Sequence, residues 1–155
     1  MSKNYGIVRL DLVKGHAYHY DIDAPIENGV LAEIDYATGK IAPTTDAKKK
    51  QVLVASVANL YDSVDESDFR NEVGTMKVRT YELEIGDFYT TTQLDFTGDR
   101  KTFDAVAKGD FAYPVVGGKL AFGTTAQVDV PQVLRVLERT TLNGYQAIVV
   151  QVESV

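Results

Sequence analysis

The chain has 155 residues and no cysteine, so a disulfide scaffold, thiolate metal ligands and a cysteine nucleophile are excluded. Its 22 acidic and 16 basic residues give a formal net charge of −6, which disfavours a nucleic-acid binder, because such proteins present a basic surface to phosphates. No apolar run approaches the roughly 20 residues of a membrane-spanning helix. We therefore expect neither nucleic acid nor a membrane among the partners.

The composition favours β structure. The chain contains 20 valines, 14 threonines and 9 tyrosines, and β-branched and aromatic side chains suit a pleated sheet. Twelve glycines divide the sequence into short segments, as is typical of a sandwich or barrel. We predict an all-β fold in a single domain over residues 1–155: a small barrel or sandwich of short antiparallel strands, with at most one or two short helices.

The first predicted strand covers Gly6–Val13, where Val8, Leu10 and Leu12 alternate with charged residues. Two interpretations of residues 1–13 stay open. The segment is an arm or edge strand that pairs with a partner, or it pairs only within the sheet of its own chain. In the first case, main-chain hydrogen bonds supply the affinity and the alternate side chains fix the register.

Four further segments follow in the first half of the chain. Ala17–Ile22 is predicted as a polar strand. Gly29–Tyr36 is predicted as a strand with Val30, Ala32 and Ile34 on one face, and it begins a hairpin over Leu31–Pro43. Gln51–Ala58 is apolar throughout much of its length, which is typical of a strand buried on both faces. Residues 61–74 are acidic and contain few β-forming side chains, so we predict one short helix or an ordered acidic loop there.

The β pattern returns in the second half. Strands are predicted over Lys77–Ile85 and Phe88–Phe96, and a hairpin with a Gly-Gly turn is predicted over Val115–Leu120. The strongest local signal is Asn143-Gly144 between two β-rich runs. This pair favours a type I′ hairpin, because both central residues of that turn need a positive φ.

The segment before that turn allows two interpretations. Pro131–Arg139 is a strand, which we favour, or a short helix that starts at its proline. A two-residue turn pairs Leu142 with Tyr145 and Leu137 with Val150, and neither face of the hairpin is then purely apolar. The strand therefore requires a bulge that shifts the register, or partial cover on both faces.

Two Gly-Asp-Phe triplets occur, at Gly86–Phe88 and Gly109–Phe111. Two triplets are too short to establish a repeat. Gly-Asp is common in hairpin turns, so we interpret both triplets as turns rather than as a functional signature.

Residues that could support chemistry do not form a recognisable site. His16 and His19 are three apart, and such positions face opposite sides of a strand, so they do not easily bind one metal ion. The acidic residues between Asp62 and Glu72 lack the EF-hand pattern. The segment around Gly118-Lys119 fails the phosphate-loop pattern. We expect no catalytic residues, no metal and no cofactor.

Several runs resemble a known family. Gly109–Gly123, Val133–Arg139 and Ala147–Glu153 together resemble the C-terminal half of tailed-bacteriophage capsid decoration proteins, also called head-stabilising or cement proteins. Gly29–Ile41 is similar to a Gly-x-Leu strand followed by an Asp-x-x-Thr-Gly-Lys turn in phage head and tail proteins. The acidic residues 61–74 have no counterpart in that pattern.

The resemblance implies a non-enzymatic virion structural protein that binds and stabilises the outer surface of a phage capsid. It implies the major capsid protein as partner and a homo-oligomer, with a trimer among the candidate assemblies. The expected location is the capsid surface of the virion, and the host cytoplasm during assembly. Two other classes stay open: a ligand-binding β-barrel for a small apolar or carbohydrate ligand, and a small hydrolase.

Partner contacts are expected from the first strand and from tyrosines near predicted turns or polar strands, because tyrosine is enriched in protein interfaces. The candidates are Ile7, Val8, Leu10, Leu12, Tyr5, Tyr18, Tyr20, Tyr36 and Tyr113. In the alternative interpretation, most of these tyrosines are half-buried residues of the sheets.

Overall fold

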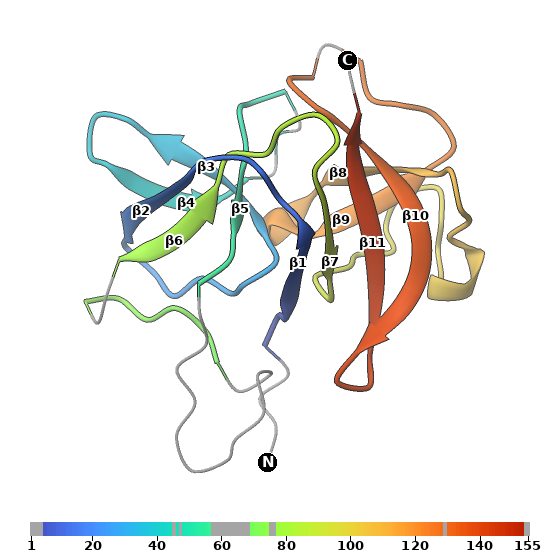
Figure 1. Cartoon of the computed structure of the whole chain (residues 1–155), viewed down its shortest axis with the longest axis horizontal. Coiled ribbons are helices and arrows are strands. Elements are labelled where there is room, and N and C mark those ends of the chain that lie inside the picture. The colour runs from blue at the N-terminus through green and yellow to red at the C-terminus, as the bar shows by residue number, and fades with distance from the viewer. Residues whose placement is uncertain are drawn as a thin grey trace.

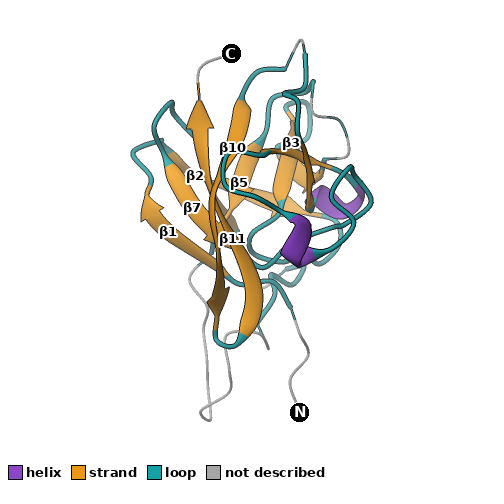
Figure 2. Ribbon diagram, turned by 90° about the vertical axis from the view of Figure 1, so that its right-hand side faces the viewer, coloured by secondary structure: helices purple, strands orange, loops and turns teal. Residues whose placement is uncertain are grey.

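The computed structural model describes residues 5–44, 46, 48–56, 69–74, 77–128 and 130–153. In this part of the chain, the regular structure is β apart from two short 3-10 helices, η2 (Phe103–Ala105) and η3 (Val116–Gly118). Figure 2 shows both helices in connections on one side of the strands. The prediction of an all-β fold with at most two short helices is confirmed. No helix among the described residues is long and apolar enough to cross a membrane.

The strands form two units (Figure 1). A closed barrel has the order β2-β4-β3-β5-β6, with bounds β2 (Ala17–Ile22), β3 (Leu31–Asp35), β4 (Lys40–Pro43), β5 (Val52–Val54) and β6 (Val78–Tyr81). An open sheet has the order β1-β7-β11-β10-β8-β9, with bounds β1 (Val8–Leu12), β7 (Phe88–Thr91), β8 (Phe111–Pro114), β9 (Leu120–Gly123), β10 (Val133–Leu142) and β11 (Tyr145–Glu153). The barrel closes through a parallel pairing of β2 with β4, whereas the other pairings are antiparallel.

The barrel interior is filled by side chains. The alternation predicted for the third strand is confirmed, because Val30, Ala32 and Ile34 all join one apolar cluster. β5 is buried throughout, as expected for a strand covered on both faces. The buried members of the cluster are Ile22, Ile26, Val30, Ala32, Ile41, Val52, Val54 and Val78.

A second apolar core joins the barrel to the open sheet. Leu31 of β3 and Leu53 of β5 are fully buried, and they belong to the same cluster as Tyr89, Phe122 and Val150 of the sheet. The pleat explains this arrangement, because neighbouring residues of a strand face opposite sides. Ala32 therefore faces the barrel interior while Leu31 packs on the sheet.

The long hairpin at the C-terminus follows the sequence closely. Asn143 and Gly144 have φ of 50° and 84°, as a type I′ turn requires, and Leu142 pairs with Tyr145. The register then shifts between Val136 and Glu138, so a bulge, one of the two alternatives, is present. The expected pairing of Leu137 with Val150 was wrong, because Val150 pairs with Val136. Residues 133–142 form a strand, which confirms the favoured interpretation of Pro131–Arg139.

The strand predicted over Gln51–Ala58 ends at Val54. Two later predicted strands were also too long. The strand expected over Lys77–Ile85 ends at Tyr81, and the one expected over Phe88–Phe96 ends at Thr91. Local side-chain hydrogen bonds explain both ends, because they offer the backbone an alternative to the ladder. The carboxylate of Asp87 accepts from the N–H of Glu84, and the hydroxyl of Thr91 accepts from the N–H of Gln93.

The acidic segment can be assessed only at its C-terminal end. Residues 57–68 lie outside the described residues, and with them most of the helix or loop predicted over 61–74. The described residues 69–74 contain a bridge and a turn rather than a helix. Asn71 forms the bridge with Ile26, and its side-chain nitrogen donates to the Asn28 side-chain oxygen, which also accepts from the N–H of Ser56.

Candidate docking surface

β1 lies at one edge of the open sheet and pairs with β7 alone among the described strands. The carbonyl of Ile7 accepts from the N–H of Thr92. Because backbone groups alternate along an antiparallel ladder, those of Val8 and Leu10 point away from β7. Two large apolar side chains on this strand are exposed, at 37% for Leu10 and 45% for Leu12. Within the described part of the chain, the β1 edge therefore presents backbone groups without a strand partner, together with apolar side chains.

The register of β1 shifts between Leu10 and Leu12, so the simple alternation expected from the sequence is interrupted there. Between these residues, Asp11 accepts from the Arg9 guanidinium at 2.6 Å and from the Thr90 hydroxyl at 2.6 Å. Both charges are thereby held against the sheet. The Arg9 side chain nevertheless stays 52% exposed, so the strand presents a cation beside the two exposed leucines.

The opposite edge of the sheet is covered by the chain itself. Leu120 of β9 donates its N–H to the carbonyl of Gln93 at 3.0 Å and accepts from the N–H of Asp95 at 2.8 Å. Further along β9, the carbonyl of Phe122 accepts from the N–H of Arg100 at 3.1 Å. An uncovered edge strand is a template for pairing with another chain. Only the β1 edge of this sheet keeps that property among the described residues.

Three of the predicted tyrosines come together on the barrel. The rings of Tyr18 and Tyr20 lie 4.9 Å apart between centroids, and Tyr36 is close enough to influence the ionisation of Tyr20. Burial raises the pKa of Tyr20, and the neighbouring Tyr36 and Tyr18 raise it further. Tyr18 and Tyr36 are 64% and 72% exposed. Lys50, whose ammonium contacts the Glu82 carboxylate at 2.8 Å, lies in the same neighbourhood.

The other predicted residues lie elsewhere. Ile7 is buried, and Val8 packs partly against the core between barrel and sheet. Tyr5 contacts the guanidinium of Arg70, whose central carbon lies 4.8 Å from the ring centroid. Tyr113 on β8 is half-buried, and burial raises its pKa, with Asp99 adding to the rise. The nine candidates thus do not form one continuous surface.

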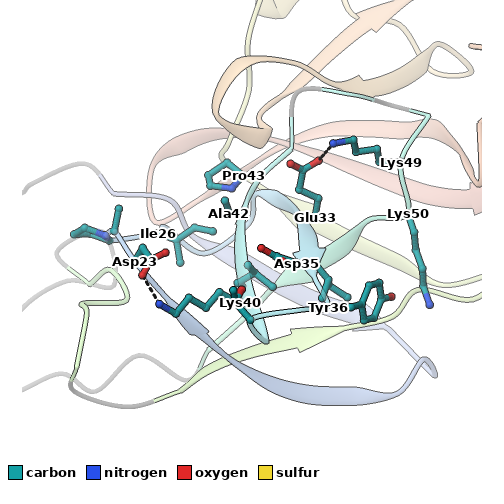
Figure 3. Close-up of a pocket in the computed structure, with 15 residues that line it drawn as sticks. Asp23, Ile26, Glu33, Asp35, Tyr36, Lys40, Ala42, Pro43, Lys49 and Lys50 are labelled. Atoms are coloured by element: carbon teal, nitrogen blue, oxygen red, sulfur yellow. Dashed lines mark hydrogen bonds and ion pairs between the residues drawn. The ribbon is translucent and has the colours of Figure 1, made fainter.

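A groove with a volume of about 740 Å³ lies between the β3–β4 hairpin, the loop Asp23–Ile26 and residues 49–50 (Figure 3). Its lining includes an apolar set and a charged set. The apolar set is Ala24, Pro25, Ile26, Ile34, Ile41, Ala42 and Pro43, together with the ring of Tyr36. The charged set is Asp23, Glu33, Asp35, Lys40, Lys49 and Lys50.

Two ion pairs fix the charged side chains of the groove (Figure 3). The ammonium of Lys40 lies 2.6 Å from Oδ1 of Asp23, and this hydrogen bond raises the pKa of Lys40. The ammonium of Lys49 lies 3.2 Å from Oε2 of Glu33. Asp35 accepts from the N–H of Ala37 at 3.0 Å, which holds the turn of the hairpin.

Sequence analysis missed this groove. Its two walls come from segments that meet only in the folded barrel, and Asp23 and Lys40 are 17 residues apart. The run Lys48–Lys50 is the one local signal, and by itself it indicates no more than a charged turn. Among the described residues, no group of three His, Asp or Glu side chains could hold a metal ion. His16 and His19 are both exposed.

Comparison with known proteins returned nothing: no family model, no curated protein and no solved structure matches this chain. The resemblance to phage decoration proteins therefore stays a prediction. The β1 edge, the tyrosines of the barrel and the groove are the features from which a function can be proposed.

Proposed function

We propose that the protein is a non-enzymatic virion structural protein that binds and stabilises the outer surface of a phage capsid. Its partner is the major capsid protein, and it binds as a homo-oligomer, with a trimer as one candidate assembly. The main support is the β1 edge, where Leu10 and Leu12 are exposed and the backbone groups of Val8 and Leu10 lack a strand partner among the described residues.

An edge of this kind suits docking onto another protein. An extended segment of the partner can add to the sheet, so that main-chain hydrogen bonds supply affinity and exposed side chains supply specificity. Tyr18 and Tyr36 offer further contact area on the barrel, since tyrosine combines a large apolar ring with a polar tip. Contacts from both units would then have to break together before the protein leaves the shell.

The packing supports surface binding over enclosure of a ligand. Among the described residues, buried aliphatic side chains fill the barrel interior, which disfavours entry of a small apolar molecule there. In the groove, the carboxylates of Asp23 and Glu33 are each paired with a lysine. Among its described lining residues the groove has no histidine, so it lacks the His–carboxylate pair that would favour a hydrolase.

A sharp test uses point substitutions on the exposed side of β1. The double variant Leu10→Lys/Leu12→Lys should keep its fold, because both side chains are exposed. It should bind purified shells of the major capsid protein at least about tenfold more weakly, as expected when a central apolar contact is lost. Val116→Lys, at an exposed apolar residue in the connection between β8 and β9 at the other side of the sheet, is the matched control and should bind normally.

Cosedimentation of each protein with empty shells measures this binding. Deleting residues 2–13 is a poorer test, because Ile7 is buried and β7 would lose one of its two partner strands, so the fold itself would suffer. Full binding by a folded Leu10→Lys/Leu12→Lys variant would remove the role of β1. Absence of any binding by the unaltered protein to shells would refute the proposed function.

A further inference from the structure

We infer that the groove between the β3–β4 hairpin, the loop Asp23–Ile26 and residues 49–50 binds a neutral oligosaccharide. This inference does not depend on capsid binding, because the groove belongs to the barrel and the β1 edge belongs to the open sheet. Its volume of about 740 Å³ is in the range of ligand sites, and it opens at the surface, so a chain longer than the groove can pass through.

The charges of the groove point to a ligand without net charge. Its lining has three carboxylates and three ammonium groups, so the formal sum is zero. A lining with this balance of charges gives no net electrostatic attraction to either an anionic or a cationic ligand. The same groups suit hydroxyls, because lysine ammonium groups donate and carboxylates accept hydrogen bonds.

Two ion pairs bring donors and acceptors of this set next to each other. Lys40 engages one oxygen of Asp23, and Lys49 engages one oxygen of Glu33. A carboxylate has about four lone-pair positions, so each retains acceptor capacity beyond its ion pair. Asp23 and Lys49 are 79% and 58% exposed in these pairs, so the hydroxyls of a ligand can reach both of them.

The apolar part of the lining suits the C–H faces of sugar rings. Tyr36 is 72% exposed and lies beside Lys50 at one side of the groove (Figure 3). Pro25, Ala42 and Pro43 are also exposed and present further C–H surface. Alternating apolar surface and fixed polar groups match a molecule whose rings carry hydroxyls at their edges and C–H bonds on their faces.

Two other ligand classes fit less well. A peptide that adds as a strand needs an open sheet edge, but β4 is paired with β3 and β2, and its last residue, Pro43, has no N–H to donate. A small apolar ligand needs an enclosed apolar cavity, whereas this groove is open and has a charged rim.

The test is saturation-transfer NMR of the full chain with maltotetraose, cellotetraose, mannotetraose and chitotetraose, and with oligogalacturonate as an acidic probe. At least one neutral tetrasaccharide should bind with a dissociation constant near or below about 1 mM. Tyr36→Ala should weaken that binding about tenfold, since a ring contact of this size is lost. Tyr18→Ala, which removes an exposed tyrosine outside the groove, should leave the affinity unchanged.

Tyr36→Ala should keep the thermal midpoint of the unaltered protein, because the side chain is mostly exposed. Three results would overturn the inference: no neutral probe binds at about 10 mM, oligogalacturonate binds more tightly than every neutral probe, or Tyr18→Ala abolishes binding while Tyr36→Ala preserves it. Tyr36 is named in both proposals, but shell binding is tested at Leu10 and Leu12, which lie outside the groove, so the two proposals can fail separately.

Discussion

Gly86–Phe88 and Gly109–Phe111 occupy equivalent places on the two sides of the β10–β11 hairpin. The first leads into β7, which neighbours β11, and the second leads into β8, which neighbours β10. Val152 of β11 donates its N–H to the carbonyl of Asp87, and Val136 of β10 donates to the carbonyl of Asp110. Both triplets therefore start a strand against the central hairpin in the same way.

The turns themselves are alike. The N–H of Asp87 donates to the carbonyl of Glu84, and the N–H of Asp110 donates to that of Ala107. The glycine before each aspartate has φ of 95° or 90°, as the third position of a type II turn requires. In return, each aspartate carboxylate accepts the N–H of the first turn residue, at 2.9 Å from Glu84 and 2.8 Å from Ala107.

The two carboxylates differ in their distant partners. Asp87 accepts from the N–H groups of Lys14 and Gly15, in the connection that follows β1. Asp110 instead receives a bidentate pair of hydrogen bonds from Arg100, at 2.8 and 3.0 Å. Each aspartate thus binds a distant segment at its own side of the sheet. Asp87 binds two backbone N–H groups, and Asp110 binds the guanidinium of Arg100.

The triplets therefore show that a local sequence can specify a turn without specifying what the turn holds. The prediction that they are turns is confirmed. Which segment reaches each carboxylate depends on the topology, because Lys14 and Asp87 are 73 residues apart and Arg100 and Asp110 are 10 apart.

Asp87→Ala should have the largest effect on stability. Asp87 is 2% exposed, and its loss leaves three backbone N–H groups without their acceptor. We expect the free energy of unfolding to fall by roughly 3 kcal/mol, since each buried unsatisfied donor costs about 1–3 kcal/mol and water reaches part of them. Urea unfolding measures the change, with the exposed Asp104→Ala as control. If Asp87→Ala lowered the free energy of unfolding by less than Asp110→Ala does, the proposed difference between the two aspartates would be contradicted.

Asp110→Ala should lower the free energy of unfolding by about half as much as Asp87→Ala. Only one backbone N–H loses its acceptor in this variant, and the Arg100 side chain can turn towards water. A double-mutant cycle with Asp110→Asn and Arg100→Gln should give a clear coupling energy. The same cycle with Asp87→Asn and Arg100→Gln should give none. Equal coupling in the two cycles would show that the carboxylates are not held in different ways.

The stabilisation that the Asp110–Arg100 ion pair provides should depend on pH in the acid range. Burial raises the pKa of Asp110, but the hydrogen bonds from Arg100 and Ala107 and the charge of Arg100 outweigh it, so the pKa lies below its usual value of 3.8. The unfolded chain then binds the proton first, and this stabilisation is lost as the pH falls below about 4. Urea unfolding of Asp110→Asn should therefore show a deficit against the unaltered protein at about pH 6 that shrinks towards about pH 3. A constant deficit would contradict this.

Features determined by neighbouring residues could be predicted from the sequence. The Asn143-Gly144 turn and the alternation of Val30, Ala32 and Ile34 follow from conformational preference and pleat alone. The ends of β6 and β7 could not be placed, because side chains of Asp87 and Thr91 compete with the ladder there. A sequence does not show which of its polar side chains will do so.

The candidate site was predictable only in part. β1 pairs with β7 of its own chain and lies at the edge of the sheet, so both interpretations of residues 1–13 stay open. Tyr18, Tyr20 and Tyr36 were named as contact residues and lie together. The groove was not predicted, because its walls depend on how the barrel closes. That closure is a parallel pairing of two short segments, Asp21-Ile22 with Lys40-Ile41, which no periodicity in the sequence indicates.

Gly86→Ala and Gly109→Ala should destabilise the protein equally, whatever their aspartates hold. Both glycines have φ near 90°, and a methyl group at either position would meet no atom within 4 Å. The expected loss is therefore conformational, about 1 kcal/mol for a side chain forced to positive φ. Chemical unfolding of the two variants side by side measures it. A difference larger than about 1 kcal/mol would show that the two turns are not equivalent.

The smallest predicted change in stability comes from a substitution at the residue that follows a triplet. Tyr89 and Ala112 occupy this place, and both belong to the core between barrel and sheet. The Tyr89 hydroxyl is fully buried and has no hydrogen-bond partner in the described part of the chain, and burial raises the pKa of Tyr89. Tyr89→Phe removes an unpaired polar group and keeps the ring, so the free energy of unfolding should rise by up to about 1 kcal/mol. Tyr18→Phe, at an exposed ring, should leave stability unchanged in the same urea titration. A loss of stability in Tyr89→Phe would instead show that the hydroxyl is hydrogen-bonded in solution, for example to a buried water.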